Sequence, residues 1–175
     1  LERLDLASLK SVREFAERML KRYSQLHFLI NNAGVMPCTY ELTVDGFEMH
    51  IGVNHIGHFH LTCLLLPSLR SAAPDSRVIN VSSMVNRFCL DLRLPDLSFS
   101  QEDYSPFKAY CQSKMANIVF TVELARRLKE SGITVVSLHP GAVRTGIQRH
   151  WNVFLRVSFL VSETFFSFPF VRAIC

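Results

Sequence analysis

Apolar residues recur at helical spacing in three parts of the chain. In residues 8–23 they return every three or four positions behind Ser8, a candidate N-cap, which predicts an amphipathic helix. Residues 46–69 and 110–130 predict two longer helices. Pro67 is expected to kink or end the first of these, because proline removes a backbone donor.

Short apolar runs between the helices predict buried strands at residues 27–30, 77–83 and 133–138. A polar, proline-interrupted stretch at 84–108 predicts a long loop. Strands that alternate with helices predict an α/β fold, here a partial Rossmann-type doubly wound parallel sheet with helices on both faces. All three strands run into small polar residues, and ligands of such sheets bind at the carboxyl ends of the strands, so we expect a site at that edge.

The composition narrows the class of protein. With 175 residues, 49% of them hydrophobic, the chain can bury the core of one domain, which excludes intrinsic disorder. The net charge is +4 and no basic run exceeds a pair, so a nucleic-acid partner is not expected. The five cysteines are odd in number and form no Cys-x-x-Cys pair, which predicts buried, reduced thiols in an intracellular compartment.

Tyr110 and Lys114 are four residues apart on a predicted helix and therefore share a face. A phenol titrates near 10, so a base at neutral pH needs a pKa lower by roughly three units, or about 4 kcal/mol. A neighbouring ammonium and a cationic cofactor ring can supply that stabilisation. Ser83, at a strand end, can hydrogen-bond a substrate oxygen. A Tyr-x-x-x-Lys pair by itself is more often a surface pair, so its spacing alone decides nothing.

The motifs occur in a fixed order along the chain. Asn-Asn-Ala-Gly at 31–34 precedes Asn54, Val-Ser-Ser at 81–83, Tyr110-x-x-x-Lys114 and Pro-Gly at 140–141. Over residues 5–150 this ordered set resembles the short-chain dehydrogenase/reductase family. Within it, the phrases LDLASLKSVREF, FLINNAGVM, GVNHIGHFHLT, AYCQSKMAN and LHPGAVRT resemble the retinol dehydrogenase-like group.

The resemblance implies an oxidoreductase that transfers a hydride between a nicotinamide cofactor and a lipophilic alcohol or aldehyde, such as a retinoid. Tyr110 would be the acid/base, and Lys114 would lower its pKa and bind the nicotinamide ribose. Ser83, rather than Ser82, would orient the substrate oxygen. Asn54 would hold a water in a proton relay.

The resemblance also implies a set of cofactor-binding residues and favours NADP(H) over NAD(H). Those near the adenosine would be Asp5, Leu6, Asn31, Asn32, Ala33 and Gly34, and those near the nicotinamide would be Pro140, Gly141, Val143 and Thr145, besides Tyr110 and Lys114. The family's Gly-rich phosphate loop has no counterpart in the sequence, which opens on Leu1 rather than Met. We therefore expect residues 1–150 to be an incomplete dinucleotide-binding and catalytic domain and the chain to be a fragment.

Two further expectations concern the strand at 27–30 and the end of the chain. The strand that would lie beside residues 27–30 in the family has no counterpart in the sequence, like the Gly-rich loop. The strand at 27–30 would become an exposed apolar edge, and the alternative function is a truncated non-catalytic variant that binds a partner there. Residues 151–175 form an apolar, aromatic segment of the same domain. It would cover the substrate, contact a membrane surface, or pack on a part of the fold outside the sequence. In a full-length parent, the family suggests association with the endoplasmic reticulum or mitochondrion.

Four histidines, His50, His55, His58 and His60, lie close together in the sequence. Their spacing does not place three ligands on one helical face, and no acidic partner is adjacent. We therefore predict that the protein has no metal site.

Overall fold

The computed structural model describes residues 1–36, 39–93 and 97–141. Its described elements, in chain order, are α1 (Leu9–Arg22), β1 (Phe28–Asn31), α2 (Met49–Ile51), the π-helical turn η1 (Gly52–Ile56), α3 (Gly57–Ser71), β2 (Arg77–Val81), the 3₁₀ turn η2 (Met84–Phe88), α4 (Pro106–Arg127), the 3₁₀ turn η3 (Lys129–Ser131) and β3 (Thr134–Leu138).

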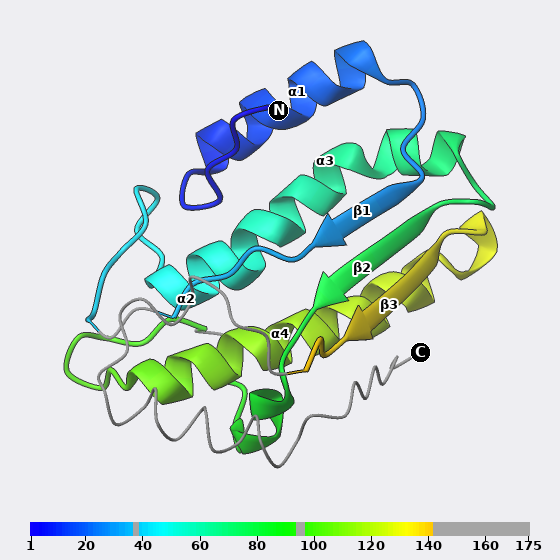
Figure 1. Cartoon of the computed structure of the whole chain (residues 1–175). Helices are drawn as coiled ribbons and strands as arrows, with labels where there is room; N and C mark the ends of the chain where they lie inside the picture. The colour runs from blue at the N-terminus through cyan, green and yellow to red at the C-terminus, as the bar shows by residue number, and fades with distance from the viewer. Residues whose placement is uncertain (37–38, 94–96, 142–175) are drawn as a thin grey trace.

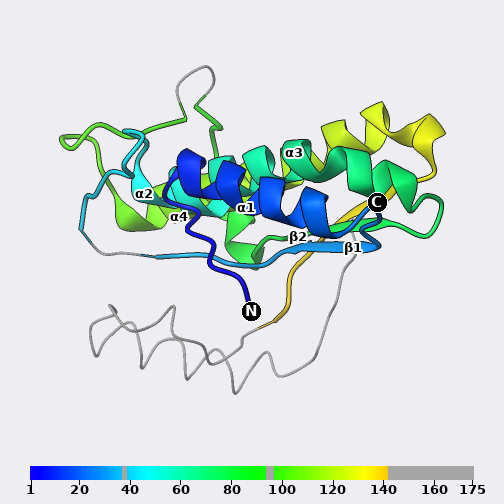
Figure 2. The same cartoon turned by 90° about the horizontal axis from the view of Figure 1, so that it is seen from above.

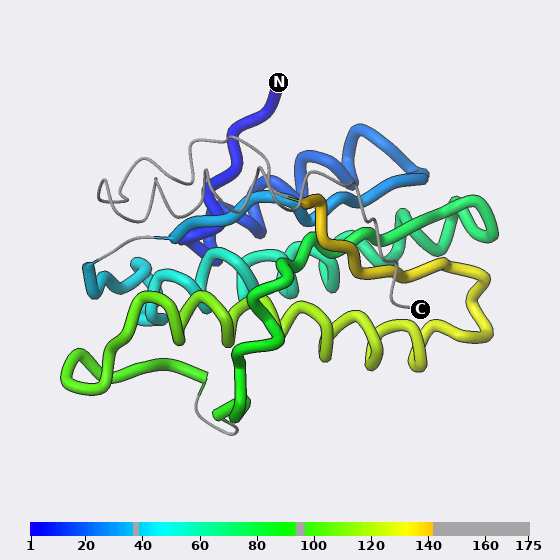
Figure 3. Tube along the Cα trace, turned by 60° about the horizontal axis from the view of Figure 1, so that its bottom comes forward, coloured from blue at the N-terminus to red at the C-terminus, as the bar shows by residue number. Residues whose placement is uncertain are grey.

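The three strands form one parallel sheet in the order β1-β2-β3. Leu29 pairs with Val78 and Val78 with Val135, so these buried side chains form a row across one face of the sheet. All three strands run in one direction, and the chain leaves them toward α2 and the start of α4 (Figures 1 and 3). The α/β fold class and the parallel Rossmann-type sheet are therefore confirmed.

The long helices α1, α3 and α4 lie on one face of the sheet (Figure 2). On the opposite face the described residues place no helix, and Phe28 and Ile30 of β1 are 62% and 58% exposed. Adjacent residues of a strand point to opposite faces of the sheet, so Phe28 and Ile30 are exposed while Leu29 and Asn31 are buried. Among the described residues β1 is an edge strand, which agrees with the predicted exposed apolar edge.

The predicted helix at 8–23 corresponds to α1, and the Ser8 side chain accepts a hydrogen bond from the Ser11 N–H, as expected of an N-cap. Val12 and Ala16 carry its buried face. Ahead of it, Leu6 packs on α3 so closely that a Cβ at Gly57 would lie 2.6 Å from the Leu6 carbonyl oxygen.

The helix predicted at 46–69 is a run of α2, η1 and α3 that begins at Met49. Pro67 does not end it, because α3 continues to Ser71 and the Ser71 hydroxyl donates to the Pro67 carbonyl at 3.1 Å. A proline removes one N–H, and the residues that follow it still close the helical turns.

Helix α4 begins at Pro106, four positions before the predicted start at residue 110. Ser105 is extended and Pro106 occupies the first turn, where its missing N–H costs nothing. The helix gives way to η3 and to Gly132, whose φ of +77° favours glycine. The predicted loop at 84–108 therefore ends earlier and contains η2.

The expectation of buried thiols is met by Cys111 and is wrong for Cys63, which is exposed on α3. Cys38 and Cys175 lie outside the described residues. No helix of the described chain has the length and apolar character needed to cross a membrane.

Candidate active site

The carboxyl ends of the strands meet the amino-terminal half of α4. The Lys114 ammonium donates to the carbonyl of Val81, the last residue of β2, at 3.2 Å. The Ser82 N–H donates to the carbonyl of Leu138, the last residue of β3, at 2.8 Å. Beyond β1, a Cβ added to Gly34 would lie 3.4 Å from Lys114 Nζ and 3.4 Å from Asn54 Oδ1. The predicted convergence of polar residues at this edge is therefore present.

Tyr110 and Lys114 stand together on α4, with Lys114 Nζ 5.6 Å from the centroid of the Tyr110 ring. Lys114 is only 3% exposed, and this burial lowers its pKa to about 8. Burial also raises the pKa of Tyr110, and a hydrogen bond with Ser83 opposes that rise. In the protein alone, burial is thus the largest influence on the pKa of the phenol.

The two adjacent serines have different partners. The Ser82 hydroxyl is buried and donates to the Lys114 carbonyl at 2.7 Å. The Ser83 side chain is hydrogen-bonded to Tyr110 and also caps η2, accepting from the Val85 N–H at 3.4 Å. Of the two serines, Ser83 is therefore the one next to the phenol, and its role in orienting the substrate stays a prediction.

Asn54 lies fully buried in η1, a π-helical turn of the kind that often marks functional sites. Its side chain accepts from the Val35 N–H at 2.8 Å and donates to the Val35 carbonyl at 3.0 Å. Its backbone carbonyl faces Asn117 Nδ2 at 3.0 Å and His58 Nδ1 at 3.1 Å. These contacts hold the turn after Gly34 in place, whereas the water relay stays a prediction.

The Asn-Asn-Ala-Gly motif is divided between the interior and the surface. Asn31 is 2% exposed, and its Nδ2 donates to Thr62 Oγ1 at 2.9 Å and to Asn80 Oδ1 at 2.8 Å. The Asn31 side chain therefore forms part of the buried hydrogen-bond network of the core. Asn32 and Ala33 are exposed beyond the end of β1, where they can line a bound ligand.

The other cofactor candidates lie at two places. Asp5 is exposed and accepts from the Ala7 N–H at 2.9 Å, whereas the Leu6 side chain is in the core. Pro140 is exposed after β3, and Gly141 has a φ of +82°. Val143 and Thr145 lie outside the described residues.

Gly34 provides a test of whether a nicotinamide dinucleotide fits this edge. A side chain there would fill the space beside Lys114 Nζ and Asn54 Oδ1, so glycine keeps it open. The Lys114 ammonium has three donors and, among the described contacts, uses one on Val81. The open space and the remaining donors fit a ribose with its hydroxyl groups.

The structure adds residues that the sequence interpretation missed. Glu48 and His50 form a buried pair beside Tyr110, whereas the sequence suggests His50 only as a possible metal ligand. Glu48 stands two positions before His50, a signal the sequence offered. Within the described residues, no three His, Cys, Asp or Glu side chains are grouped so that they could hold a metal ion.

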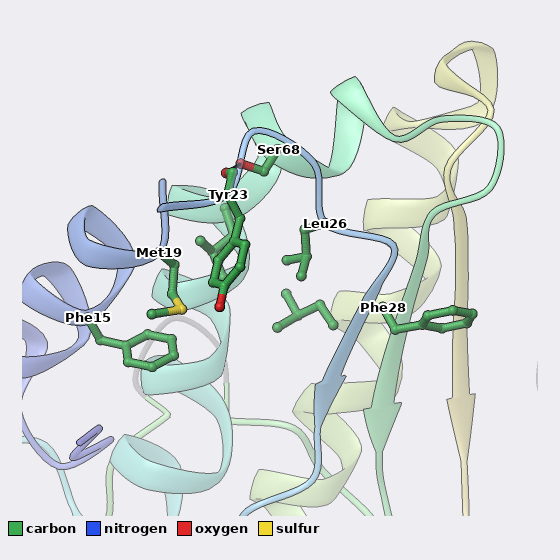
Figure 4. Close-up of a pocket in the computed structure, with 8 residues that line it drawn as sticks. Phe15, Met19, Tyr23, Leu26, Phe28 and Ser68 are labelled. Atoms are coloured by element: carbon green, nitrogen blue, oxygen red, sulfur yellow. Dashed lines mark hydrogen bonds between the residues drawn. The ribbon is translucent and has the colours of Figure 1, made fainter. Parts of the chain in front are cut away.

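A cavity of about 250 Å³ lies at the opposite end of β1, between α1 and α3 (Figure 4). Its wall is almost wholly apolar and includes Phe15, Met19, Tyr23, Leu26 and Phe28. None of the predicted site residues lines it.

The chain is similar to known proteins over most of its length. A family model described as "Enoyl-(Acyl carrier protein) reductase" matches residues 2–161. Human retinol dehydrogenase 11 is 49% identical over 169 residues, which are 97% of this chain and 52% of that protein. Human retinol dehydrogenase 13 is 51% identical over 150 residues, 86% of this chain and 45% of that protein. The chain thus spans about half the length of the curated relatives it matches.

Solved structures show the same fold. An uncharacterized protein from Mycobacterium paratuberculosis matches with a TM-score of 0.72 and 46% identity, over 85% of this chain and 53% of that one. NADPH-bound carbonyl reductase from chicken fatty liver matches with a TM-score of 0.63 and 28% identity, over 82% of this chain and 58% of that one. On its motifs, its fold and its relatives, the chain belongs to the short-chain dehydrogenase/reductase family.

Proposed function

We propose that the protein is an oxidoreductase that interconverts a lipophilic alcohol and its aldehyde with NADP(H), and that residues 1–150 belong to its dinucleotide-binding and catalytic domain. One observation carries this proposal. The Tyr110 phenol is hydrogen-bonded to Ser83 and adjoins the buried Lys114 ammonium, next to the space that Gly34 leaves open.

Three residues of the chain have separate roles in this reaction. Tyr110 donates a proton to the substrate oxygen in reduction and accepts it back in oxidation. Ser83 holds the same oxygen by a hydrogen bond. Lys114 binds the nicotinamide ribose and, as a cation, favours the phenolate. When bound, the nicotinamide dinucleotide supplies or accepts the hydride.

An apolar surface beside Ser83 supports a lipophilic substrate. Phe88 of η2 and Phe107 of α4 are 63% and 47% exposed, and their rings are 5.9 Å apart. Leu90 is 97% exposed after the same turn, and Met84 is 40% exposed at its start. Apolar side chains that flank a catalytic pair bind an apolar substrate and leave its polar end at the pair. The retinol dehydrogenase relatives support a retinoid-like substrate.

The relatives also support the cofactor preference. The chicken carbonyl reductase structure contains NADPH, which favours NADP(H) for this chain as well. We further infer an intracellular location with contact to a membrane of the endoplasmic reticulum or mitochondrion. For residues 151–175 the aromatic composition and sparse charge support that contact.

Turnover of all-trans-retinal with NADPH, measured on the complete protein, tests the function. We expect wild-type turnover and a loss of about 10²- to 10⁴-fold in Tyr110→Phe, which removes the proton and keeps the ring. Folding, followed by circular dichroism, should be the same in both. Turnover of Tyr110→Phe near the wild-type level would overturn the role of Tyr110. No turnover by the wild type with any lipophilic aldehyde would favour the non-catalytic alternative.

A further inference from the structure

A buried glutamate–histidine pair lies directly beside Tyr110. Glu48 and His50 are 1% and 0% exposed, and Glu48 Oε1 is 2.6 Å from His50 Nδ1. The Glu48 carboxylate also accepts from the backbone N–H of His50 at 2.9 Å and of Ile51 at 3.1 Å. Three donors therefore hold this carboxylate at the start of α2, and the carboxylate in turn fixes the imidazole.

The hydrogen bond with Glu48 determines which imidazole nitrogen carries the hydrogen. A carboxylate accepts hydrogen bonds and does not donate them, so His50 Nδ1 carries the hydrogen of this bond. Nε2 is buried and has no hydrogen-bond partner among the described residues. A buried polar atom left unpaired destabilises the folded state, and an apolar side chain at this position would avoid that cost.

The imidazole packs against the ring of the proposed acid/base. The His50 and Tyr110 ring centroids are 6.1 Å apart with 64° between the planes, an edge-to-face contact of the kind aromatic rings prefer. Lys114 Nζ lies 5.6 Å from the centroid of the same Tyr110 ring, and Ser83 is hydrogen-bonded to its hydroxyl. Tyr110 is therefore contacted from α2, from the end of β2 and from its own helix.

His50 also contacts the loop that leads into α4. The Tyr104 hydroxyl lies 3.5 Å from His50 Nδ1 and donates to the Thr39 carbonyl at 3.1 Å. The rings of His50 and Tyr104 are 6.2 Å apart. One imidazole thus touches both Tyr110 and the end of the loop that precedes its helix.

We propose that Glu48 and His50 are a positioning pair for Tyr110, a role that rests on the proposed function. The carboxylate orients the imidazole, and the imidazole holds the phenol ring so that its hydroxyl stays at Ser83. A misplacement of about 1 Å can cost as much as 100-fold in rate, so loss of this contact should reduce kcat and leave dinucleotide binding largely intact.

The test compares His50→Phe with the wild type in the complete protein. We expect kcat to fall about tenfold while the KM for the dinucleotide stays within about twofold. In the cofactor-free protein, the ¹³Cζ NMR signal of Tyr110 should shift or broaden. His60→Phe is the matched control, because His60 also has a buried, unpartnered Nε2 but no described ring contact with Tyr110. His60→Phe should change neither kcat nor the ¹³Cζ signal of Tyr110.

Glu48→Gln provides a second variant if His50→Phe does not fold. Its amide keeps the shape but replaces one accepting oxygen by a donor and removes the charge, so the hydrogen bonds that residue 48 makes to His50 and Ile51 are weakened. The ¹⁵N shifts of His50 report the weaker hydrogen bond at Nδ1, and the Tyr110 signal should move with it. An unchanged Tyr110 signal in both folded variants, or in Glu48→Gln alone, overturns the pair's role even if the wild type shows no turnover. Absence of wild-type turnover would contradict only the proposed function.

Discussion

Two buried polar clusters of the chain differ in how their groups are paired. Under the sheet, Asn31 donates to Thr62 and Asn80, and Asn80 donates to Thr121 at 2.9 Å, a row that we call the polar ladder. Around Tyr110, a buried ammonium has one described hydrogen bond and a buried imidazole nitrogen has no partner among the described residues. The ladder leaves one acceptor, Asn31 Oδ1, without a partner among the described residues and pairs its other amide groups, whereas the buried Lys114 ammonium keeps donors available for a ligand, at a cost in stability.

A large difference in turnover should separate variants of the two serines at the end of β2. Ser83→Ala should lower turnover about 100-fold, because it removes a donor at the substrate oxygen. Ser82→Ala should leave turnover nearly unchanged and lower the free energy of unfolding by about 1 kcal/mol, because its hydroxyl bonds the Lys114 carbonyl. Steady-state kinetics and urea unfolding of both variants check this, and a larger kinetic loss for Ser82→Ala would contradict the assignment.

In the ladder, Asn80→Leu should lower the free energy of unfolding by about 2–3 kcal/mol. The change removes two hydrogen bonds and leaves Asn31 Nδ2 and Thr121 each without one partner. Turnover per folded molecule should not change. A loss below 0.5 kcal/mol in urea unfolding, on the order of experimental error, would show that the ladder contributes little.

At the site, Lys114→Met should have the opposite effect on stability. It removes a buried cation, and we expect unfolding to cost about 1–2 kcal/mol more at pH 7, with turnover lost. Because the pKa of Lys114 falls from 10.5 to about 8 on folding, the unfolded chain binds more protons between these values. Wild-type stability therefore rises with pH in this window.

The increase in the free energy of unfolding caused by Lys114→Met therefore depends on pH. It should be complete below about pH 8 and shrink as the pH rises toward 10.5. Urea unfolding of both proteins at pH 6, 7, 8 and 9, below the range in which tyrosines ionise, measures the difference. A variant less stable than the wild type at pH 7 would show that the Val81 hydrogen bond outweighs the cost of burying the charge.

The sequence predicted the fold class and the strands well, because short apolar runs and helical spacing are local signals. The start of α4 was missed because Ser105 and Pro106 were read as part of a loop, although proline suits the first turn of a helix. Pro67 predicts a kink or an end of the helix, but α3 continues past it to Ser71 because a proline removes only one N–H.

The site was predicted from motifs rather than from contacts. The spacing of Tyr110 and Lys114 placed them on one face, and the structure brings Ser83 and Gly34 to them. The sequence did not indicate that burial governs both pKa values, since burial depends on the whole fold. The pair formed by Glu48 and His50 was missed for the same reason, because its contact with Tyr110 joins distant parts of the chain.

The most direct test of the site is the thermal shift of the complete protein with NADPH and with NADH, for the wild type and for Lys114→Met. A ligand at about 100 times its Kd stabilises the folded state by about 2.7 kcal/mol. We predict that NADPH raises the Tm of the wild type more than NADH does, and that Lys114→Met, although more stable alone, loses most of this rise. A wild-type Tm unchanged by either dinucleotide, or an equal rise in Lys114→Met, would contradict the assignment of this edge of the sheet as the cofactor site.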